Sequence, residues 1–318
     1  MKVLIVKTSS MGDVIHTLPA LTDAQKAMPH IQFDWVVEEN FAEIPYWHSA
    51  VNKVIPVAIR RWRKNLFSWQ TWREWQAYLT LLRAEKYDAV IDAQGLIKSA
   101  VLVTKQANGV KYGYDKYSAR EGLSSWFYDK TFNIPYQQHA VARIRQLFAK
   151  ALDYTLPEEI GDYGIAQHFA KIRENSTAYV VMIHATTRAD KHWPETHWAD
   201  LIRSTTALGL RVHLPWGNEQ EKARAERLAK LSADVVVLPK MSLTELALEI
   251  ANAKAVVSVD TGLSHLTAAL DKPNIILYGA TDPKLIGAYG KNQHYLTGNN
   301  MESILPYRVW QGLEALFE

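Results

Sequence analysis

Hydrophobic positions along this chain fall into short apolar runs that alternate with stretches of helical spacing. The clearest case is the segment 255–283, where an apolar run at 256–259 precedes a helical pattern over 263–270 and a second apolar run at 275–279. A buried strand, a connecting helix and another buried strand form the repeating unit of a doubly wound parallel sheet. This segment therefore predicts one such unit.

The same alternation extends through both halves of the chain. Pro19 should kink or restart the first helix, and Ser242 with Glu245 should form a capping box. The pattern predicts strands at 3–6, 31–39, 54–57, 89–92, 178–184, 210–214 and 235–238, and helices at 14–28, 69–79, 95–106, 137–152, 198–208, 220–231, 243–251 and 307–317.

The best candidate for a linker is the segment 153–163, which contains Pro157, Gly161 and several acids. A chain of 318 residues is long enough for two domains. We predict an α/β fold of two Rossmann-like doubly wound domains facing a central cleft. They cover 1–155 and 156–300. A C-terminal helix lies within 301–318, and one arrangement that we consider is its packing on the N-terminal domain.

Composition narrows the class of protein. Apolar residues make up 48% and charged residues 22%, which indicates a globular chain. The absence of cysteine excludes disulfides, zinc–thiolate sites and cysteine nucleophiles. A net charge of +3 is too small to indicate nucleic-acid binding by itself. We find neither a signal-peptide pattern nor an apolar run of membrane-spanning length, and we expect a cytoplasmic protein.

The turn at Asp260, Thr261 and Gly262 lies where a predicted strand meets a helix N-terminus. Free backbone N–H groups and the helix dipole favour a phosphate there, and Gly262 allows close approach. Asp260 would repel a phosphate, so it either caps the helix or accepts hydrogen bonds from sugar hydroxyls. His265, one turn later, is either a ligand-binding residue or a packed one.

A second polar loop follows the first predicted strand and ends at Asp13. In a doubly wound domain this loop lies at the carboxyl edge of the sheet, where ligands bind. Asp13 therefore has two interpretations, a helix N-cap or a general base.

The strongest local charge signal is the basic cluster at 60–64, and a stripe of tryptophans at 69, 72 and 75 follows it with helical spacing. A basic cluster beside an aromatic stripe suits an anionic amphiphile or an anionic membrane surface. The alternative is a solvated basic turn followed by a helix packed on its domain.

Loops and helix starts in the second half supply hydroxyls, a lysine, an acid and a methionine. This set suits a diphosphate, ribose hydroxyls and a base, although neither GxxxxGK[ST] nor GxGxxG occurs. His184, His192 and His197 fit no common metal-site spacing, so we expect no metal. The residues of this set are Thr186, Thr187, Lys191, Glu221 and Met241.

Three segments carry a resemblance to a known family. Residues 7–20 (KTSSMGDVIHTLPA) resemble the opening of the bacterial lipopolysaccharide heptosyltransferases, and residues 258–265 (SVDTGLSH) resemble their donor-site signature. The loop 184–194 (HATTRADKHWP) is most similar to the members that add the first heptose. The likeness covers essentially the whole chain.

The resemblance implies a metal-independent, inverting glycosyltransferase of the GT-B architecture, without a cofactor. Its donor would be ADP-L-glycero-D-manno-heptose and its acceptor the inner Kdo of Kdo2-lipid A, so the N-terminal domain would bind the acceptor and the C-terminal domain the donor. Such an enzyme would contact the cytoplasmic face of the inner membrane peripherally. Asp13 matches the family's general base.

The remaining site residues follow from the same resemblance. Lys191 would stabilise the leaving ADP together with Thr186 and Thr187. Glu221 and Met241 would hold the nucleoside, and Asp260, Thr261, Gly262 and His265 would position the sugar and diphosphate. On the acceptor side we expect Ser9, Ser10 and Gly12. The basic cluster is assigned to the phosphates and carboxylates of the acceptor by its charge more than by a motif, and consists of Arg60, Arg61, Arg63 and Lys64.

Three rival functions stay open on the sequence. A non-catalytic sugar-nucleotide binder would need no base, and a membrane adaptor would bind lipid without nucleotide. A sibling heptosyltransferase would add the second heptose and differ only in its acceptor, although the loop 184–194 argues against it.

Overall fold

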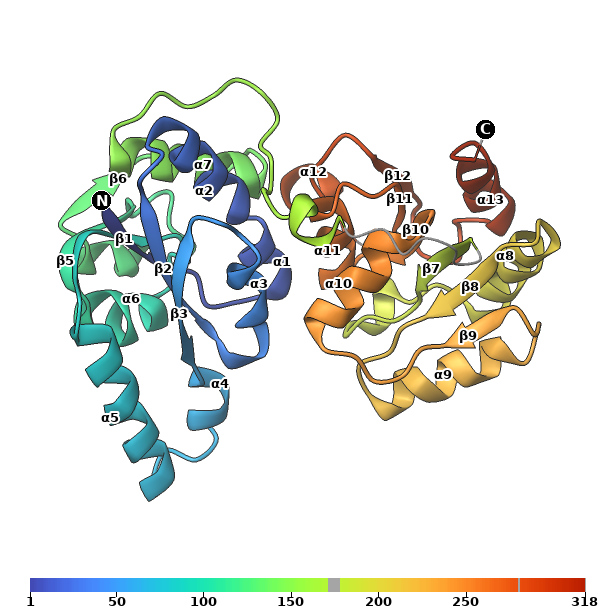
Figure 1. Ribbon diagram of the computed structural model, residues 1–318, viewed down its shortest axis with the longest axis horizontal. Coiled ribbons are helices and arrows are strands. Elements are labelled where there is room, and N and C mark those ends of the chain that lie inside the picture. The colour runs from blue at the N-terminus through green and yellow to red at the C-terminus, as the bar shows by residue number, and fades with distance from the viewer. Residues whose placement is uncertain (171–177, 280, 318) are drawn as a thin grey trace. The chain divides into compact units, whose positions relative to one another are not determined.

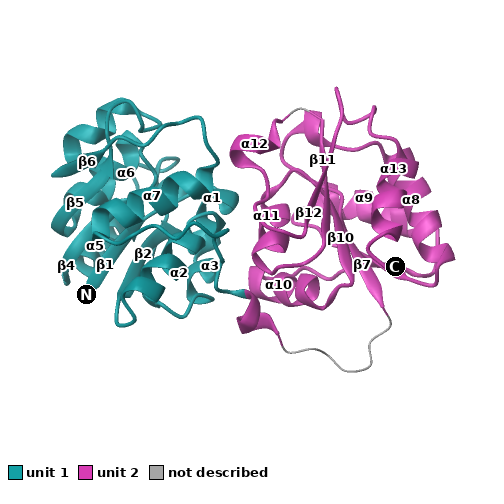
Figure 2. Cartoon of the chain, turned by 90° about the horizontal axis from the view of Figure 1, so that it is seen from above, with its two compact units in different colours: residues 1–165 teal, residues 166–318 magenta. Residues whose placement is uncertain are grey.

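The computed structural model describes residues 1–170, 178–279 and 281–317, and the chain forms two compact units, Met1–Ile165 and Ala166–Glu318 (Figure 2). The boundary lies ten residues after the predicted one at 155. The reason is that the predicted linker packs on unit 1: Arg145 donates hydrogen bonds to the carbonyls of Pro157 (3.2 Å) and Glu159 (2.9 Å), and Tyr163 is buried.

Unit 1 is built on a parallel sheet whose strand order is β3-β2-β1-β4-β5-β6. This is the Rossmann order, and it reverses between β1 and β4. The strands are β1 (Lys2–Val6), β2 (Gln32–Glu38), β3 (Val51–Val57), β4 (Lys86–Asp92), β5 (Asn108–Tyr114) and β6 (Lys130–Phe132).

Helices cover both faces of this sheet (Figure 1). The rings of Phe33 on β2 and Phe148 on α7 lie 6.2 Å apart, while Leu79 on α5 packs in a cluster with Leu4 and Val36 on the opposite face. The helices are α1 (Met11–Ile15), α2 (Leu18–Ala27), α3 (Glu43–Tyr46), α4 (Ile59–Trp62), α5 (Trp69–Arg83), α6 (Ile97–Leu102) and α7 (Ala140–Leu152), with 3₁₀ turns η1 (Glu39–Phe41), η2 (Thr104–Gln106) and η3 (Gly122–Phe127).

Unit 2 repeats the same topology. Its parallel sheet has the order β12-β11-β10-β7-β8-β9, which is the Rossmann order counted from β7, and it reverses between β7 and β10. The two sheets confirm the predicted pair of doubly wound domains. The strands are β7 (Tyr179–Ile183), β8 (Arg211–Leu214), β9 (Val235–Val237), β10 (Ala255–Val259), β11 (Asn274–Tyr278) and β12 (Gln293–Thr297).

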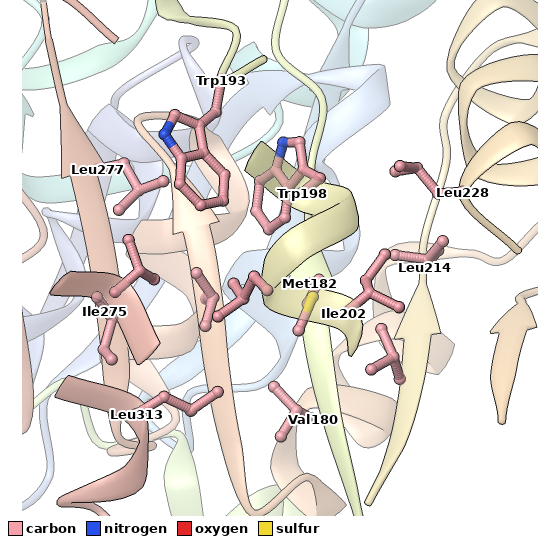
Figure 3. Packing of buried hydrophobic residues seen from close by; sticks show 14 of the residues in the cluster. Val180, Met182, Trp193, Trp198, Ile202, Leu214, Leu228, Ile275, Leu277 and Leu313 are labelled. Atoms are coloured by element: carbon pink, nitrogen blue, oxygen red, sulfur yellow. The ribbon is translucent and has the colours of Figure 1, made fainter. Parts of the chain in front are cut away.

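The core of unit 2 includes Trp193 and Trp198, whose rings meet edge to face at 4.9 Å (Figure 3). Val309 and Leu313 of the C-terminal helix belong to this core, so that helix packs on unit 2. The helices are α8 (Glu195–Ala207), α9 (Glu219–Ala229), α10 (Leu243–Asn252), α11 (Gly262–Ala269), α12 (Pro283–Ile286) and α13 (Pro306–Glu314), with 3₁₀ turns η4 (Ala166–Phe169) and η5 (Ala189–Lys191).

Several local predictions are confirmed. The first helix breaks after Ile15 and restarts at Leu18 with Pro19 in its first turn. Ser242 and Glu245 form the capping box, with hydrogen bonds of 2.7 and 3.2 Å.

None of the described helices is long and apolar enough to cross a bilayer.

Candidate functional site

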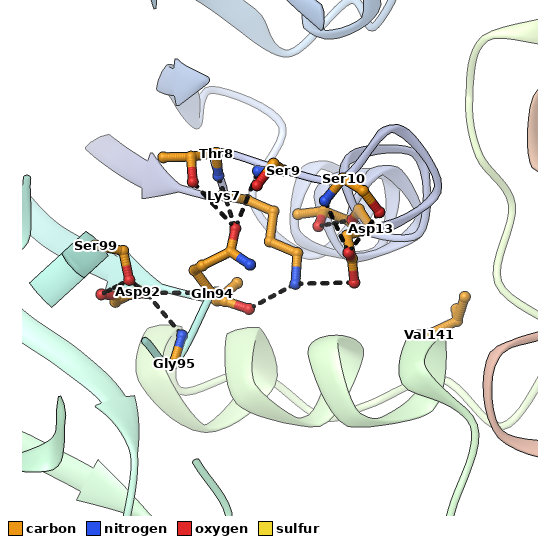
Figure 4. A network of polar contacts seen from close by, with 12 residues as sticks. Lys7, Thr8, Ser9, Ser10, Asp13, Asp92, Gln94, Gly95, Ser99 and Val141 are labelled. Atoms are coloured by element: carbon orange, nitrogen blue, oxygen red, sulfur yellow. Dashed lines mark hydrogen bonds and ion pairs between the residues drawn. The ribbon is translucent and has the colours of Figure 1, made fainter. Parts of the chain in front are cut away.

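The switch point of unit 1 brings the end of β1 next to the end of β4 (Figure 4). Lys7 follows β1 and is 5% exposed. Its Nζ donates to the Ala93 carbonyl oxygen at 2.9 Å and lies 3.7 Å from Oδ1 of Asp13. Burial lowers the pKa of Lys7, and the Asp13 carboxylate opposes this effect.

Asp13 occupies the third position of α1 and closes a capping box with Ser10. The Ser10 backbone N–H and hydroxyl both donate to Oδ2 of Asp13, at 2.8 and 2.9 Å. The interpretation of Asp13 as the N-cap is therefore wrong, because Ser10 is the N-cap residue and Asp13 closes the box from the third helical position. The Asp13 side chain is still 34% exposed, so it can reach a ligand as well.

The electrostatic surroundings keep Asp13 ionised. Burial alone would raise the pKa of its carboxyl, but the Lys7 ammonium, the two Ser10 hydrogen bonds and the Arg120 charge together lower that pKa. Arg143 and Arg120 also lower the pKa of Lys7. The loop consequently combines an ionised carboxylate with a strongly positive field.

A buried polar scaffold fixes the loop that carries Asp13. Oε1 of Gln94 accepts hydrogen bonds from the backbone N–H groups of Thr8 (2.9 Å) and Ser9 (3.1 Å). Asp92 is fully buried and accepts from the Gln94 and Gly95 N–H groups at 2.9 and 3.1 Å. The predicted site residues did not include Lys7, Asp92 or Gln94, although their positions at the carboxyl ends of β1 and β4 could have indicated them.

The other residues predicted on the acceptor side have different surroundings. Ser9 and Gly12 are buried, whereas Ser10 is exposed. Arg61 is engaged in ion pairs with Glu39 (3.1 Å) and Glu74 (2.7 Å), and it therefore holds α4 in place. The basic neighbours of Arg61 in the sequence are exposed; they are Arg60, Arg63 and Lys64.

The switch point of unit 2 shows a similar pairing of lysine and carboxylate. The Lys191 ammonium makes an ion pair with Oδ2 of Asp260, and their side chains are only 14% and 9% exposed. Thr186 donates to the Asp260 carbonyl oxygen at 3.4 Å, whereas Thr187 is exposed. The loop after β7 is thus joined to the turn after β10.

Asp260 does not cap α11, so the capping interpretation of this residue is wrong. The N-cap is Thr261, whose side chain makes no capping hydrogen bond, and Gly262 begins the helix. The Asp260 carboxylate turns to Lys191 instead, because a nearly buried acid gains more from a cation than from one backbone N–H. His265 is 8% exposed, as its packing interpretation predicted.

Glu221 and Met241 lie at the same edge of this sheet. Glu221, in the first turn of α9, accepts hydrogen bonds from the Gly217 N–H (2.7 Å) and the Asn218 amide (2.8 Å). Met241 is partly exposed just before α10. The structure therefore gathers the predicted donor residues at the carboxyl ends of β7, β8, β9 and β10.

No group of three or more His, Cys, Asp or Glu side chains that could hold a metal ion occurs among the described residues. Burial, aided by the Arg224 charge, lowers the pKa of His184 to about 4. His184 is therefore neutral at physiological pH.

Comparisons with known proteins identify the family to which this chain belongs. The model of "Glycosyltransferase family 9 (heptosyltransferase)" matches residues 75–305. The chain is 63% identical over 294 residues to Lipopolysaccharide heptosyltransferase 1 of Escherichia coli K12, covering 92% of both chains. It is 54% identical to the Pseudomonas aeruginosa protein of the same name, over 93% of this chain and 83% of that one.

Solved structures agree. "E. coli heptosyltransferase WaaC with ADP" matches with a TM-score of 0.97 and 59% identity, covering 99% of this chain and 100% of that one. The same enzyme "with ADP-2-deoxy-2-fluoro heptose" matches with a TM-score of 0.94, 58% identity and 99% coverage of both chains. The chain therefore belongs to glycosyltransferase family 9, the heptosyltransferases, and is a glycosyltransferase, as its motifs predicted.

Proposed function

We propose that this chain transfers L-glycero-D-manno-heptose from ADP-heptose to the inner Kdo of Kdo2-lipid A, with inversion at the anomeric carbon. The observation that carries the proposal is 63% identity, over 92% of both chains, to an E. coli protein named Lipopolysaccharide heptosyltransferase 1. A second support is the solved relative with an ADP-heptose analogue.

Asp13 is the general base of the proposed reaction. It removes the proton from the attacking Kdo hydroxyl, whose oxygen forms the new bond to the anomeric carbon of heptose. The bond from that carbon to the diphosphate oxygen breaks, and its electron pair leaves with ADP. The lowered pKa of Asp13 supports this role, because a base must be ionised before the proton moves.

Lys191 stabilises the negative charge that develops on ADP. An ammonium has three N–H donors, so Lys191 can keep one bond to Asp260 and turn the others to the diphosphate. The N-terminal amides of α11, with Thr186 and Thr187, add donors from the same edge of the sheet. A lysine and a helix N-terminus together supply positive charge without a metal.

The remaining predicted residues bind the donor and the acceptor at the carboxyl edges of the two sheets. Glu221 binds the ribose hydroxyls and Met241 the adenine, while Asp260 and His265 orient the heptose. On unit 1, Ser9, Ser10 and Gly12 shape the acceptor loop. The phosphates and carboxylates of the acceptor meet the basic residues Arg60, Arg61, Arg63 and Lys64, and the protein works peripherally at the cytoplasmic face of the inner membrane.

The direct test is ADP release from ADP-heptose, with and without Kdo2-lipid A, in the presence of EDTA. We expect release that depends on the acceptor and persists in EDTA. Release that requires a heptosylated acceptor would assign the chain to addition of the second heptose. Donor binding without release on either acceptor would indicate a binder, and absence of ADP-heptose binding would overturn the donor assignment.

A further inference from the structure

The connection between α4 and α5, together with the first turn of α5, exposes large apolar side chains to solvent. We call residues 63–72 the tip segment; Figure 1 shows it at the far end of α5, beyond the rest of unit 1. Its four large apolar side chains are Leu66 (67% exposed), Phe67 (104%), Trp69 (71%) and Trp72 (62%).

The exposure ends abruptly along α5. Trp75 packs against Trp62, with ring centres 5.7 Å apart, and Tyr78 and Leu82 are buried in the core of unit 1. The tryptophan stripe therefore has two parts: its C-terminal part holds α5 on the sheet, and its N-terminal part faces solvent. Large apolar side chains that gather in one exposed segment mark an interaction site.

The charge around the tip segment identifies the partner. Residues 59–73 contain five basic side chains and no acidic one. Only Arg61 among the five forms a salt bridge among the described residues, whereas Arg60, Arg63, Lys64 and Arg73 are exposed. Phe, Leu and Trp flanked by Arg and Lys are the combination that enters the interface of an anionic bilayer.

We propose that the tip segment is a membrane anchor, whose Leu66, Phe67, Trp69 and Trp72 enter the acyl boundary of an anionic lipid bilayer while the neighbouring basic residues bind lipid phosphates. The inference deepens the proposed function, since a lipid-linked acceptor must be met at a membrane. The anchor follows β3 and the Asp13 loop follows β1, so both lie at the carboxyl edge of the same parallel sheet.

Co-sedimentation with vesicles tests the anchor without any acceptor present. Vesicles of phosphatidylcholine with one quarter phosphatidylglycerol, free of lipopolysaccharide, should bind the wild-type chain. The triple variant Leu66→Ser/Phe67→Ser/Trp69→Ser should have an affinity for these vesicles that is lower by about ten-fold or more. The control Ile286→Ser/Tyr307→Ser removes apolar side chains of similar exposure (52% and 59%) from unit 2 and should bind like the wild type.

Activity on two forms of the acceptor separates the anchor from the transfer reaction. The triple variant should keep its kcat/KM on a deacylated, water-soluble acceptor and show a raised KM on the acylated acceptor embedded in vesicles. Failure of the wild type to bind the vesicles, or equal binding by the triple variant, would overturn the anchor. Equal loss on both acceptors would also overturn it, because the tip would then serve the reaction itself. Vesicle binding without any transfer would instead refute the proposed function alone.

Discussion

At the scale of single residues, the two switch points use the same pair of side chains for different tasks. In unit 1, Lys7 lies near a partly exposed carboxylate, and this keeps Asp13 charged and accessible. In unit 2, Lys191 forms an ion pair with the nearly buried carboxylate of Asp260, next to the N-terminus of α11. The first arrangement suits a base, and the second suits the stabilisation of a leaving anion.

The role of Lys7 can be tested through the pH dependence of kcat/KM. The Lys7 ammonium lowers the pKa of Asp13, so Lys7→Met should raise that pKa and move the acidic limb of the profile to higher pH. Lys7→Arg keeps the charge and serves as the control. An acidic limb at the same pH in Lys7→Met would show that Lys7 does not set the ionisation of the base.

Lys191→Ala should weaken donor binding and lower turnover by roughly 10²–10³-fold, because it removes a cation from the leaving group. It also leaves the Asp260 carboxylate buried without its ion pair, which could lower stability. The double variant Lys191→Ala/Asp260→Asn should recover thermal stability and still turn over more slowly than Asp260→Asn alone. Equal turnover in the double variant and in Asp260→Asn would remove Lys191 from the chemistry.

At the scale of elements, a buried ion pair ties the helix after Asp13 to the last helix of unit 1. Arg145 on α7 donates to both carboxylate oxygens of Asp23 on α2, at 2.6 and 3.3 Å, and both side chains are buried. The same guanidinium binds the carbonyls of Pro157 and Glu159. One side chain thus fixes α2, α7 and the segment that ends the unit.

Removal of this guanidinium should be costly, since it leaves a buried carboxylate without its partner. We expect Arg145→Leu to lower the free energy of unfolding by about 3–5 kcal/mol, measured by urea denaturation. The variant Asp23→Leu/Arg145→Leu should recover part of that loss. A loss below about 1 kcal/mol in Arg145→Leu would mean that the pair contributes little to the packing of α2 on α7.

The elements that the sequence predicted best are those with dense apolar patterns. β1, β10 and α10 were found because runs of buried residues or a capping box define them. β5, β6 and β12 were missed, because β6 and β12 are edge strands with polar sequences and β5 lies beside an edge and contains two glycines. A strand that is stabilised mainly by pairing with a neighbouring strand need not have a strong strand pattern in its own sequence.

The candidate site residues also fall into two groups, those that the sequence predicted and those that it did not. The motifs predicted Asp13, Lys191 and Asp260 as site residues, but they gave no indication of the buried scaffold of Asp92 and Gln94. Nor could the sequence tell that Asp260 would pair with Lys191 rather than cap α11, since the two lie 69 positions apart. Contacts between distant loops depend on the order of strands in the sheet.

At the scale of the whole molecule, each unit contains a buried histidine whose pKa the fold lowers well below its usual value. Burial lowers the pKa of His48 in unit 1 and of His184 in unit 2 to about 4 each. The backbone N–H of Ala50 donates to Nδ1 of His48 at 3.1 Å, and Nε2 lies 2.9 Å from the Thr22 hydroxyl. Protonation would disrupt the first of these bonds.

These histidines should make the chain sensitive to acid. In the unfolded state each histidine gains a proton as the pH falls through 6.5, whereas in the folded state it stays unprotonated until about pH 4. The free energy of unfolding therefore decreases between pH 6.5 and pH 4. We expect urea denaturation to show a free energy of unfolding a few kcal/mol lower at pH 5 than at pH 7.5. His48→Asn keeps an acceptor for Ala50 and should lose less; an unchanged slope would contradict this account of His48.

The central claim is that Asp13 of unit 1 performs the proton transfer while unit 2 alone binds the donor nucleotide. The measurement that tests it most directly is turnover of Asp13→Asn together with its affinity for ADP-heptose. The account predicts a loss of roughly 10²–10⁴-fold in turnover with an unchanged donor Kd. Normal turnover would remove Asp13 as the base, and a much weaker donor Kd would contradict the assignment of the two tasks to separate units.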